Sequence, residues 1–454
     1  MATSHLNRRV QSKQIICTLL ILICPTLFSL SAFTQDAAPA PTPAPAPAPA
    51  PTTFLTQKYL LGDWGGERTK LAEEKGISFD FFYVTDMLAA TSAAVHTGSG
   101  AWNRVRGTMD IDFNKLAGWK GFSFHVTGLW QGGVNVGAQY LGSISNPSGL
   151  VSQRTEILDS YWLAWAMPGN KATLRFGQFA SMDYYGLQSY GGNYLMEPLD
   201  YGFNNRFNDY ASFDPASGPG VQLIVTPYPF VNVSMAYTSG NRNPYFQDPN
   251  GFHYVKHNSG VLSDSITINV DQTTPGKPVK EKYYPGQYEV GSTYNNGKFT
   301  DPFFPVPLYQ STDTGNYVFY MSANQAVYRP KPHNSSGLDL LFGLAFSPNA
   351  PYNFVNRNML AGLRYNGPFP SRPQDSIGFG VSYSHVSDQY NSSYLLANPG
   401  AHPYGSETAY EVNYLFQPTP YWIIQPVLQW YTSVGGISSN GTGVVIGFRT
   451  KVNF

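Results

Sequence analysis

The sequence predicts an all-β fold, a transmembrane antiparallel β-barrel of about 16 strands preceded by a short N-terminal periplasmic helix. Apolar and polar side chains alternate along many segments after Ile77, the opening segment has the features of a secretory signal, and the terminal strand ends on an aromatic residue, Phe454. Strands with one apolar and one polar row suit a wall between lipid and water. The terminal strand alone equally allows a soluble sandwich with one buried face.

Composition excludes a membrane protein built of helices. Mean hydropathy is -0.24, and no long apolar run follows the first segment, whereas each spanning helix needs about 20 apolar residues. The same hydropathy does not exclude a membrane-spanning β-barrel, because alternation of apolar and polar residues lowers the average hydropathy of its strands. The formal net charge is zero, so no broad basic field indicates a nucleic-acid partner.

Residues 1–35 are predicted to be a signal peptide. Two arginines and a lysine precede an apolar run over residues 15–30, and small residues follow it. The general secretion route is favoured over the twin-arginine route because Gln11 occupies a position where that motif has an apolar residue. Both cysteines, Cys17 and Cys24, lie in this segment, so we expect no disulfide and no thiolate metal site in the mature chain.

A linker and a helical segment are predicted to precede the barrel. Residues 36–53 are rich in alternating Ala and Pro, which favours an extended polyproline II tether. Residues 54–76 are predicted to form an N-terminal periplasmic helical segment. In that segment Asp63 can cap the helix and Gly76 can end it in a left-handed conformation.

The period-2 pattern recurs over residues 77–454, which we predict to be one outer-membrane barrel domain. Every second residue from Val105 to Phe113 is apolar or glycine, and the residues between them are polar or charged. Turn sequences such as Pro168-Gly169-Asn170 end one strand and begin the next. The predicted strands are 77–86, 104–114, 122–130, 156–166, 171–179, 221–226, 231–237, 317–327, 338–346, 359–365, 376–386, 409–416, 421–431 and 444–454.

The number of strands follows from the length of the domain. These fourteen strands leave two ambiguous stretches, 183–203 and 282–293, that could supply two more. About 24 residues for each strand and its connection also gives roughly sixteen, the size that leaves an aqueous channel, with fourteen or eighteen as alternatives. Three long polar segments, 132–153, 188–219 and 240–316, remain, and we expect one to fold inward and narrow the channel.

Three motifs resemble one family. The segment from Leu60 to Ile77, LLGDWGGERTKLAEEKGI, resembles the opening signature of the carbohydrate-selective porins of the OprB type. Asp110 to Gly128 and Asn170 to Phe179 are similar to two of that family's strand segments, whereas no family segment can be placed on residues 240–316. The resemblance implies an outer-membrane porin for passive, selective diffusion of carbohydrates, glucose and other small sugars, into the periplasm of a Gram-negative bacterium.

The polar rows of the strands supply candidate sugar-binding groups. Selective passage of a sugar requires charged or amide hydrogen-bonding groups beside aromatic surfaces, and both signs of charge together avoid a strong ion preference. Aromatic partners are expected from Tyr184, Tyr185, Tyr190 or Tyr194 of a loop. Each charged residue could instead line the water-filled lumen without binding sugar. The residues predicted to line the pore are Arg104, Arg106, Asp110, Asp112, Glu156 and Arg175.

Two other functions remain open, a general non-selective porin and an outer-membrane enzyme of the lipase or acyltransferase type. The sequence has no HExxH, GxSxG or phosphate-loop spacing, and His125 and His385 stand alone in their rows, so we predict no enzyme, cofactor or metal. Expected partners are carbohydrates, outer-membrane lipid and lipopolysaccharide, and the barrel-assembly machinery through the C-terminal strand. The choice between monomer and trimer is left open.

Overall fold

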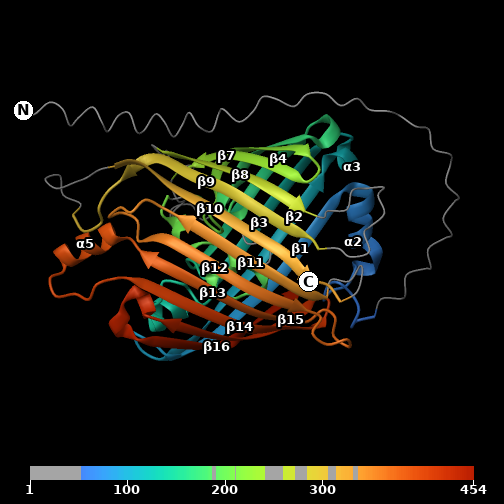
Figure 1. The fold of residues 1–454 in the computed structure, drawn as a ribbon. Coiled ribbons are helices and arrows are strands. Elements are labelled where there is room, and N and C mark those ends of the chain that lie inside the picture. The colour runs from blue at the N-terminus through green and yellow to red at the C-terminus, as the bar shows by residue number, and fades with distance from the viewer. Residues whose placement is uncertain are drawn as a thin grey trace, which may run out of the picture. The chain divides into compact units, whose positions relative to one another are not determined.

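The computed structural model describes residues 53–186, 191–209, 211–240, 259–270, 284–304, 313–330 and 336–454 (Figure 1). Within these residues, sixteen antiparallel strands pair in chain order, and β1 also pairs with β16, which closes the barrel. Closure gives every strand a hydrogen-bonded neighbour on both sides, as a structure surrounded by lipid requires. The predicted barrel of about 16 strands is therefore confirmed.

The strands are β1 Ile77–Ser92, β2 Gly98–Asp112, β3 Phe122–Gly133, β4 Thr155–Ala166, β5 Ala172–Phe179, β6 Gly218–Tyr228, β7 Val231–Ser239, β8 Gly260–Val270, β9 Gly286–Phe299, β10 Asp313–Tyr328, β11 Gly337–Phe346, β12 Val355–Asn366, β13 Ser376–Val386, β14 Ser406–Thr419, β15 Trp422–Thr432 and β16 Thr442–Asn453. The α-helices are α2 Glu67–Lys70, α3 Phe113–Ala117, α4 Glu197–Asp200 and α5 Asp388–Ala397. No helix among the described residues has the length and hydropathy needed to span a membrane.

All fourteen predicted strands overlap observed strands, but the two additional strands differ from expectation in part. The stretch 282–293 does contribute to β9, whereas 183–203 is a loop that carries α4. The other additional strand is β8. It lies inside the long polar segment 240–316, where no strand was predicted before residue 282. Its outward row contains Asp264 between Leu262 and Ile266, and this carboxylate interrupts the apolar alternation that marks a strand.

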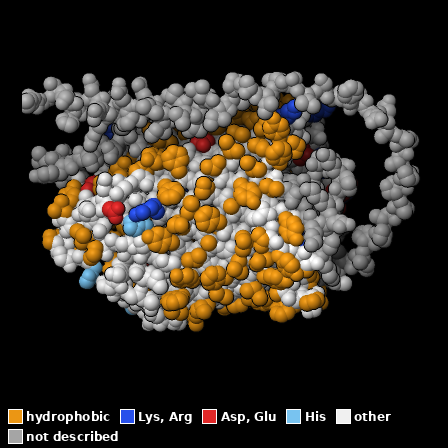
Figure 2. All heavy atoms as spheres, viewed as in Figure 1, with side chains coloured by type: hydrophobic (Ala, Val, Ile, Leu, Met, Phe, Trp, Pro, Cys, Tyr) orange, Lys and Arg blue, Asp and Glu red, His pale blue; other side chains and the backbone are white. Residues whose placement is uncertain are grey.

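The terminal strand presents the two rows that its sequence predicts. Ile446 and Phe448 are exposed on the outer face, whereas Val445 and Arg449 are buried inside the barrel. Hydrophobic side chains cover much of the visible outer face in Figure 2, as a lipid-facing wall requires. The face visible in Figure 2 can therefore lie against hydrocarbon.

The N-terminal segment packs against the barrel at the end where the chain terminates. Its helical turns run from Trp64–Gly66 through α2 to Leu71–Lys75. The carboxylate of Asp63 accepts a hydrogen bond from the amide of Thr69 at 2.9 Å. Gly76 has a φ of 69°, and a side chain there would collide with the main chain of Asp112, so only glycine ends the helix at this point.

The barrel interior holds a long loop as well as side chains from the wall. The loop between β5 and β6 spans residues 180–217, and its described part lies inside the ring of strands, where Tyr194, Leu195 and Leu199 are fully buried. They belong to one apolar cluster with wall residues such as Leu360 of β12. One of the three long polar segments therefore does fold inward.

Candidate functional site

Two arginines of β2 anchor the inward loop. Arg104 and Arg106 lie on the inner row, and the Nη1 atom of each is 3.0 Å from Oδ2 of Asp214 in the loop. Burial opposes the charge of Asp214, but the two guanidinium groups outweigh it and hold the pKa of that carboxyl below its usual value. Arg104 also donates to the Gln131 side chain and to the carbonyl oxygen of Leu150, so it serves mainly as an anchor.

A second ionic anchor joins the first strand, the last strand and the loop. Arg449 of β16 donates from Nε and Nη2 to the two carboxylate oxygens of Asp86 in β1, at 2.7 and 2.9 Å. Its Nη1 atom donates to Asp200 of α4 at 3.0 Å. Such a bidentate pair fixes orientation as well as position. Burial raises the pKa of Asp200 to about 6, although Arg449 opposes this shift.

Two buried glutamates of β14 hold the main chains of two loops. Glu411 accepts hydrogen bonds from the amides of Leu195 and Met196 at 2.9 and 2.7 Å. Glu407 accepts from the amides of Ile144 and Ser145, in the loop between β3 and β4, at 2.9 and 2.7 Å. Carboxylates that receive main-chain N–H groups in this way replace the water that those amides would otherwise bind.

These anchors were not predicted from the sequence. The alternation of Glu407 and Glu411 with apolar residues places both on the inner row of β14, but nothing nearby in the chain identifies their loop partners. Asp86 and Arg449 are buried charged residues of the first and last strands, 363 positions apart in the chain. The signal that could have found them is a charge on an inner row, because a buried charge requires a partner.

A stack of three rings and a guanidinium group lines the inner wall where β3, β4 and β5 meet. The rings of His125 and Trp162 are 4.7 Å apart and nearly parallel, with an interplanar angle of 12°. The guanidinium carbon of Arg175 lies 4.3 Å from the Trp162 ring and 4.2 Å from the ring of Tyr184 in the inward loop. Asp110 of β2 lies 2.6 Å from Nδ1 of His125 and is half exposed. We call these five residues the ring stack.

Much of the ring stack is engaged in contacts among its own members. His125 stacks on Trp162, and the Arg175 guanidinium group lies against the rings of Trp162 and Tyr184. Arg175 donates to the side chain of Gln222, yet its Nε has no hydrogen-bond partner in the part of the chain that the structure describes. This Nε atom is buried, so the half-exposed carboxylate of Asp110 is the polar group of the stack that a ligand can reach.

The other predicted pore residues lie elsewhere. The Asp112 side chain caps α3 by accepting a hydrogen bond from the amide of Asn114 at 2.9 Å. Glu156 is on the outer row of β4 and pairs with Trp130 of β3. The prediction that Glu156 lines the lumen is therefore wrong. The pairing of β3 with β4 skips Asp159, and a bulge of this kind reverses the faces of the residues before it relative to those after it, so Glu156 and Trp162 point to opposite sides.

The tyrosines predicted as aromatic partners also lie in different environments. Among the described candidates, Tyr184 contacts a predicted pore residue, Arg175, through its ring. Tyr185 is buried with its hydroxyl 2.7 Å from the Ser234 hydroxyl, and Tyr194 donates to main-chain carbonyl oxygens from a fully buried position. Tyr190 lies outside the described residues.

An arrangement like that of a hydrolase triad also occurs in the barrel. Asp110 contacts His125, and Nε2 of His125 lies 3.0 Å from the hydroxyl of Thr127. Thr127 is completely buried, and its hydroxyl is also 3.0 Å from that of Thr108. A nucleophile must reach its substrate, so this buried hydroxyl does not form a site for acyl transfer.

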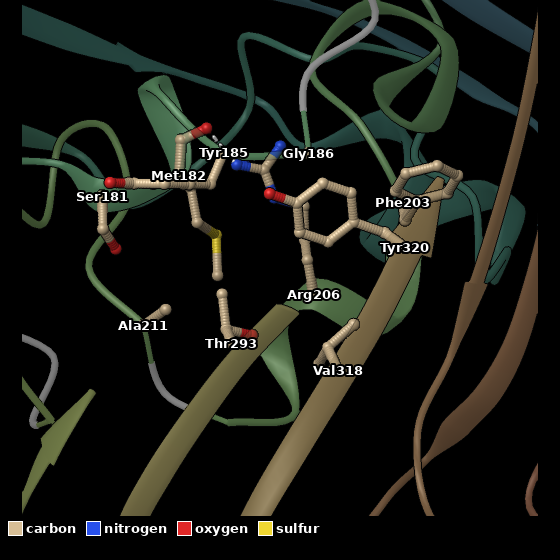
Figure 3. Close-up of a pocket in the computed structure, with 10 residues that line it drawn as sticks. All are labelled: Ser181, Met182, Tyr185, Gly186, Phe203, Arg206, Ala211, Thr293, Val318 and Tyr320. Atoms are coloured by element: carbon tan, nitrogen blue, oxygen red, sulfur yellow. Dashed lines mark hydrogen bonds between the residues drawn. The ribbon is translucent and has the colours of Figure 1, made fainter. Parts of the chain in front are cut away.

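A small cavity lies between the inward loop and the wall formed by β9 and β10 (Figure 3). Met182, Phe203 and Val318 contribute apolar surface to it, and Arg206 directs its guanidinium group to the carbonyl oxygens of Met182 and Tyr201. These donors are engaged, which leaves little to bind sugar hydroxyls. Over the described ranges, no group of three or more His, Cys, Asp or Glu residues could hold a metal ion.

Comparison with known proteins decides the family. The model of the carbohydrate-selective porin, OprB family, matches residues 98–454. This chain belongs to the OprB family of carbohydrate-selective porins. Porins of this family are channels of the Gram-negative outer membrane, so the chain is a carbohydrate-selective porin. The matched range also includes β8 and β9. It therefore extends over the segment 240–316, on which the sequence motifs alone placed no family segment.

Relatives agree with this assignment. Porin B of Pseudomonas aeruginosa is 26% identical over 437 residues, which cover 87% of this chain and 91% of that protein. The putative porin QuiX of Acinetobacter baylyi is 22% identical over 423 residues, which cover 88% of this OprB-family chain and 93% of QuiX. The high-pH structure of Pseudomonas putida OprB has a TM-score of 0.78 at 20% identity and covers 89% of this chain and 100% of its own.

Proposed function

We propose that this porin passes small neutral sugars, glucose among them, by passive diffusion, and that the ring stack hydrogen-bonds them in transit. The observation that carries the proposal is the ring stack itself, in which the partly exposed cation Arg175 and the half-exposed carboxylate Asp110 lie beside three aromatic rings on the inner wall. Sugar hydroxyls both donate and accept hydrogen bonds, so a wall with both kinds of group suits them. Arg106, whose side chain is 23% exposed, is proposed to continue this path.

The pairing of charges supports neutral substrates. Asp86, Asp200 and Asp214 each contact an arginine, so the ionic anchors of the inward loop carry little unbalanced charge, whereas Glu411 is held by main-chain amides. A wall with paired charges gives polar contacts without a strong preference for cations or anions. Because sugar must be released after it binds, individual contacts are expected to be weak, and no catalytic step is proposed.

Conductance measurements test this function. The full-length protein in planar bilayers should give small conductance steps that glucose partly blocks. Liposome swelling with sugars of increasing size should then show an upper size limit set by the inward loop. Strongly ion-selective conductance that sugars leave unchanged would identify a general porin instead and would reject the sugar path.

We further propose how the chain reaches its membrane. Residues 1–35 direct export, residues 36–53 form a periplasmic tether, and the barrel-assembly machinery recognises the terminal strand. The amide of Phe454 donates to the carbonyl oxygen of Phe81 at 2.8 Å, which supports a role for this residue in closing the barrel. Deletion of Phe454 should lower the yield of folded barrel in the outer membrane, measured by heat-modifiable mobility on gels. An unchanged yield would argue against the terminal signal.

A further inference from the structure

An exposed arginine stands on the lipid-facing row near one rim of the barrel. Arg357 is the third residue of β12, and its neighbours on the outer face are Phe346 of β11 and His385 of β13. Arg357 is exposed, and the described residues offer its side chain no hydrogen bond or ion pair. Apolar surface adjoins it, since Phe346 and Met359 are both exposed on the same face.

The position of Arg357 along the barrel places it at the extracellular side. The strand ends near Arg357 lead to α5, which lies at the opposite end of the barrel from α2 and the C-terminus (Figure 1). In outer-membrane barrels the chain termini and short turns face the periplasm, and the longer loops face outward. Arg357 therefore lies at the level of the outer-leaflet headgroups.

Polar groups adjoin Arg357 on the loop side. His385 has Nδ1 at 2.7 Å from the Ser406 hydroxyl and Nε2 at 3.5 Å from the Asp388 carboxylate. The hydroxyl of Tyr383 is 2.8 Å from that of Ser406. Figure 2 shows basic, acidic and histidine side chains together near the edge of the hydrophobic face, where the surface becomes polar. The patch is thus apolar on one side and polar on the other.

We propose that Arg357 binds a phosphate group of lipid A in the outer leaflet, with Phe346 and Met359 against its acyl chains. A guanidinium group forms bidentate hydrogen bonds with phosphate oxygens, and it is weakly hydrated, so it suits a site at the edge of hydrocarbon. An arginine on a lipid-facing row is costly near the middle of a bilayer and tolerated near its surface, where anionic headgroups attract it. Charge complementarity therefore favours a phosphorylated lipid over a neutral one.

Lipid titration tests the site. Full-length protein in detergent is titrated with bisphosphorylated lipid A, and bound lipid is counted by native mass spectrometry. Arg357→Gln should weaken binding about fivefold, the effect expected of one basic residue at an anionic surface. Lys120→Gln, which removes an exposed charge from the periplasmic turn between β2 and β3, is the matched control and should bind as the parent does.

Two further arms separate phosphate recognition from acyl-chain packing. Dephosphorylated lipid A should bind the parent and Arg357→Gln equally, and Asp388→Asn should bind the phosphorylated lipid more tightly because a nearby negative charge is removed. Arg357→Lys keeps the charge and should retain part of the affinity if Arg357→Gln folds poorly. The proposal is overturned if Arg357→Gln binds phosphorylated lipid A like the parent, or if the parent does not distinguish the two lipids.

Discussion

Arg68 donates a hydrogen bond from Nη1 to the main-chain carbonyl oxygen of Phe454, 386 positions later in the chain, at 2.7 Å. Its Nη2 atom donates to the carbonyl oxygen of Phe79 in β1 at 2.6 Å, and its guanidinium group lies 3.3 Å from the centre of the Tyr59 ring. One buried side chain therefore joins the N-terminal helix, the first strand and the end of the last strand.

Replacing Arg68 with Ala should loosen this junction. Two carbonyl oxygens at the closing seam would lose a charged donor, which typically costs about 1.5–3 kcal/mol for each hydrogen bond of this kind in a buried setting. The expected result is a lower temperature for the heat-induced mobility shift on gels. Lys70→Ala is the control, since Lys70 is mostly exposed and pairs only with Glu67 at 3.6 Å. Equal shifts in the two variants would contradict the role given to Arg68.

Glu411→Gln should make the channel current noisier. The substitution keeps the shape of the side chain but replaces a charged acceptor of the Leu195 and Met196 amides with a neutral one. The loop should then lose roughly 1–2 kcal/mol of anchoring, because charge-assisted hydrogen bonds are about twice as strong as neutral ones. Single-channel recordings measure this as more frequent brief fluctuations. Glu73→Gln, on the exposed N-terminal helix, should leave the recordings unchanged.

Arg175→Gln should weaken sugar block. The variant removes the partly exposed guanidinium group of the ring stack, and loss of a hydrogen bond to a charged group is expected to raise the half-blocking glucose concentration about tenfold or more. The measurement is the sugar titration of single-channel conductance. Lys171→Gln removes an equal charge from an exposed position just before β5 and serves as the control. If Arg175→Gln binds glucose as the parent does, the sugar path lies elsewhere in the lumen.

Most of the wall could be predicted from the sequence because alternation is a local property. A strand such as β3 shows its two faces within ten residues, and lipid requires the outer one to be apolar. The exceptions also have local causes. Asp264 interrupts the outer row of β8, where it accepts a hydrogen bond from Ser292 at 2.6 Å, and the register shift beside Gly128 turns Glu156 outward.

The interior could not be predicted in the same way. Glu411 holds amides that lie 216 and 215 positions earlier in the chain, and Arg449 contacts Asp86 across 363 positions. Such pairs exist only after the barrel has closed, so no spacing in the sequence reveals them. The aromatic contribution of the inward loop was likewise expected from several tyrosines, and among the described ones the loop places the ring of Tyr184 against Arg175.

Glu197 should make the inward loop sensitive to pH. Glu197 lies in α4 and is half-buried, and burial raises its pKa to about 7, with Arg206 opposing the shift. A carboxyl whose pKa is higher in the folded than in the unfolded protein favours folding when protonated. Its stabilising contribution is therefore complete below about pH 4.5, the ordinary value, and is lost as the pH rises through about 7.

The parent should consequently lose loop stability between about pH 4.5 and pH 7, and Glu197→Gln should abolish that part of the pH dependence. Hydrogen exchange of the loop amides near Glu197, measured across this range, reports the stability directly. Lumen water reaches the side chain and limits the size of the effect. Asp214 acts in the opposite direction, because its lowered pKa removes stability only at acidic pH. A slope that persists in Glu197→Gln would assign the titration to another carboxyl, and Asp200→Asn would then be the variant to compare.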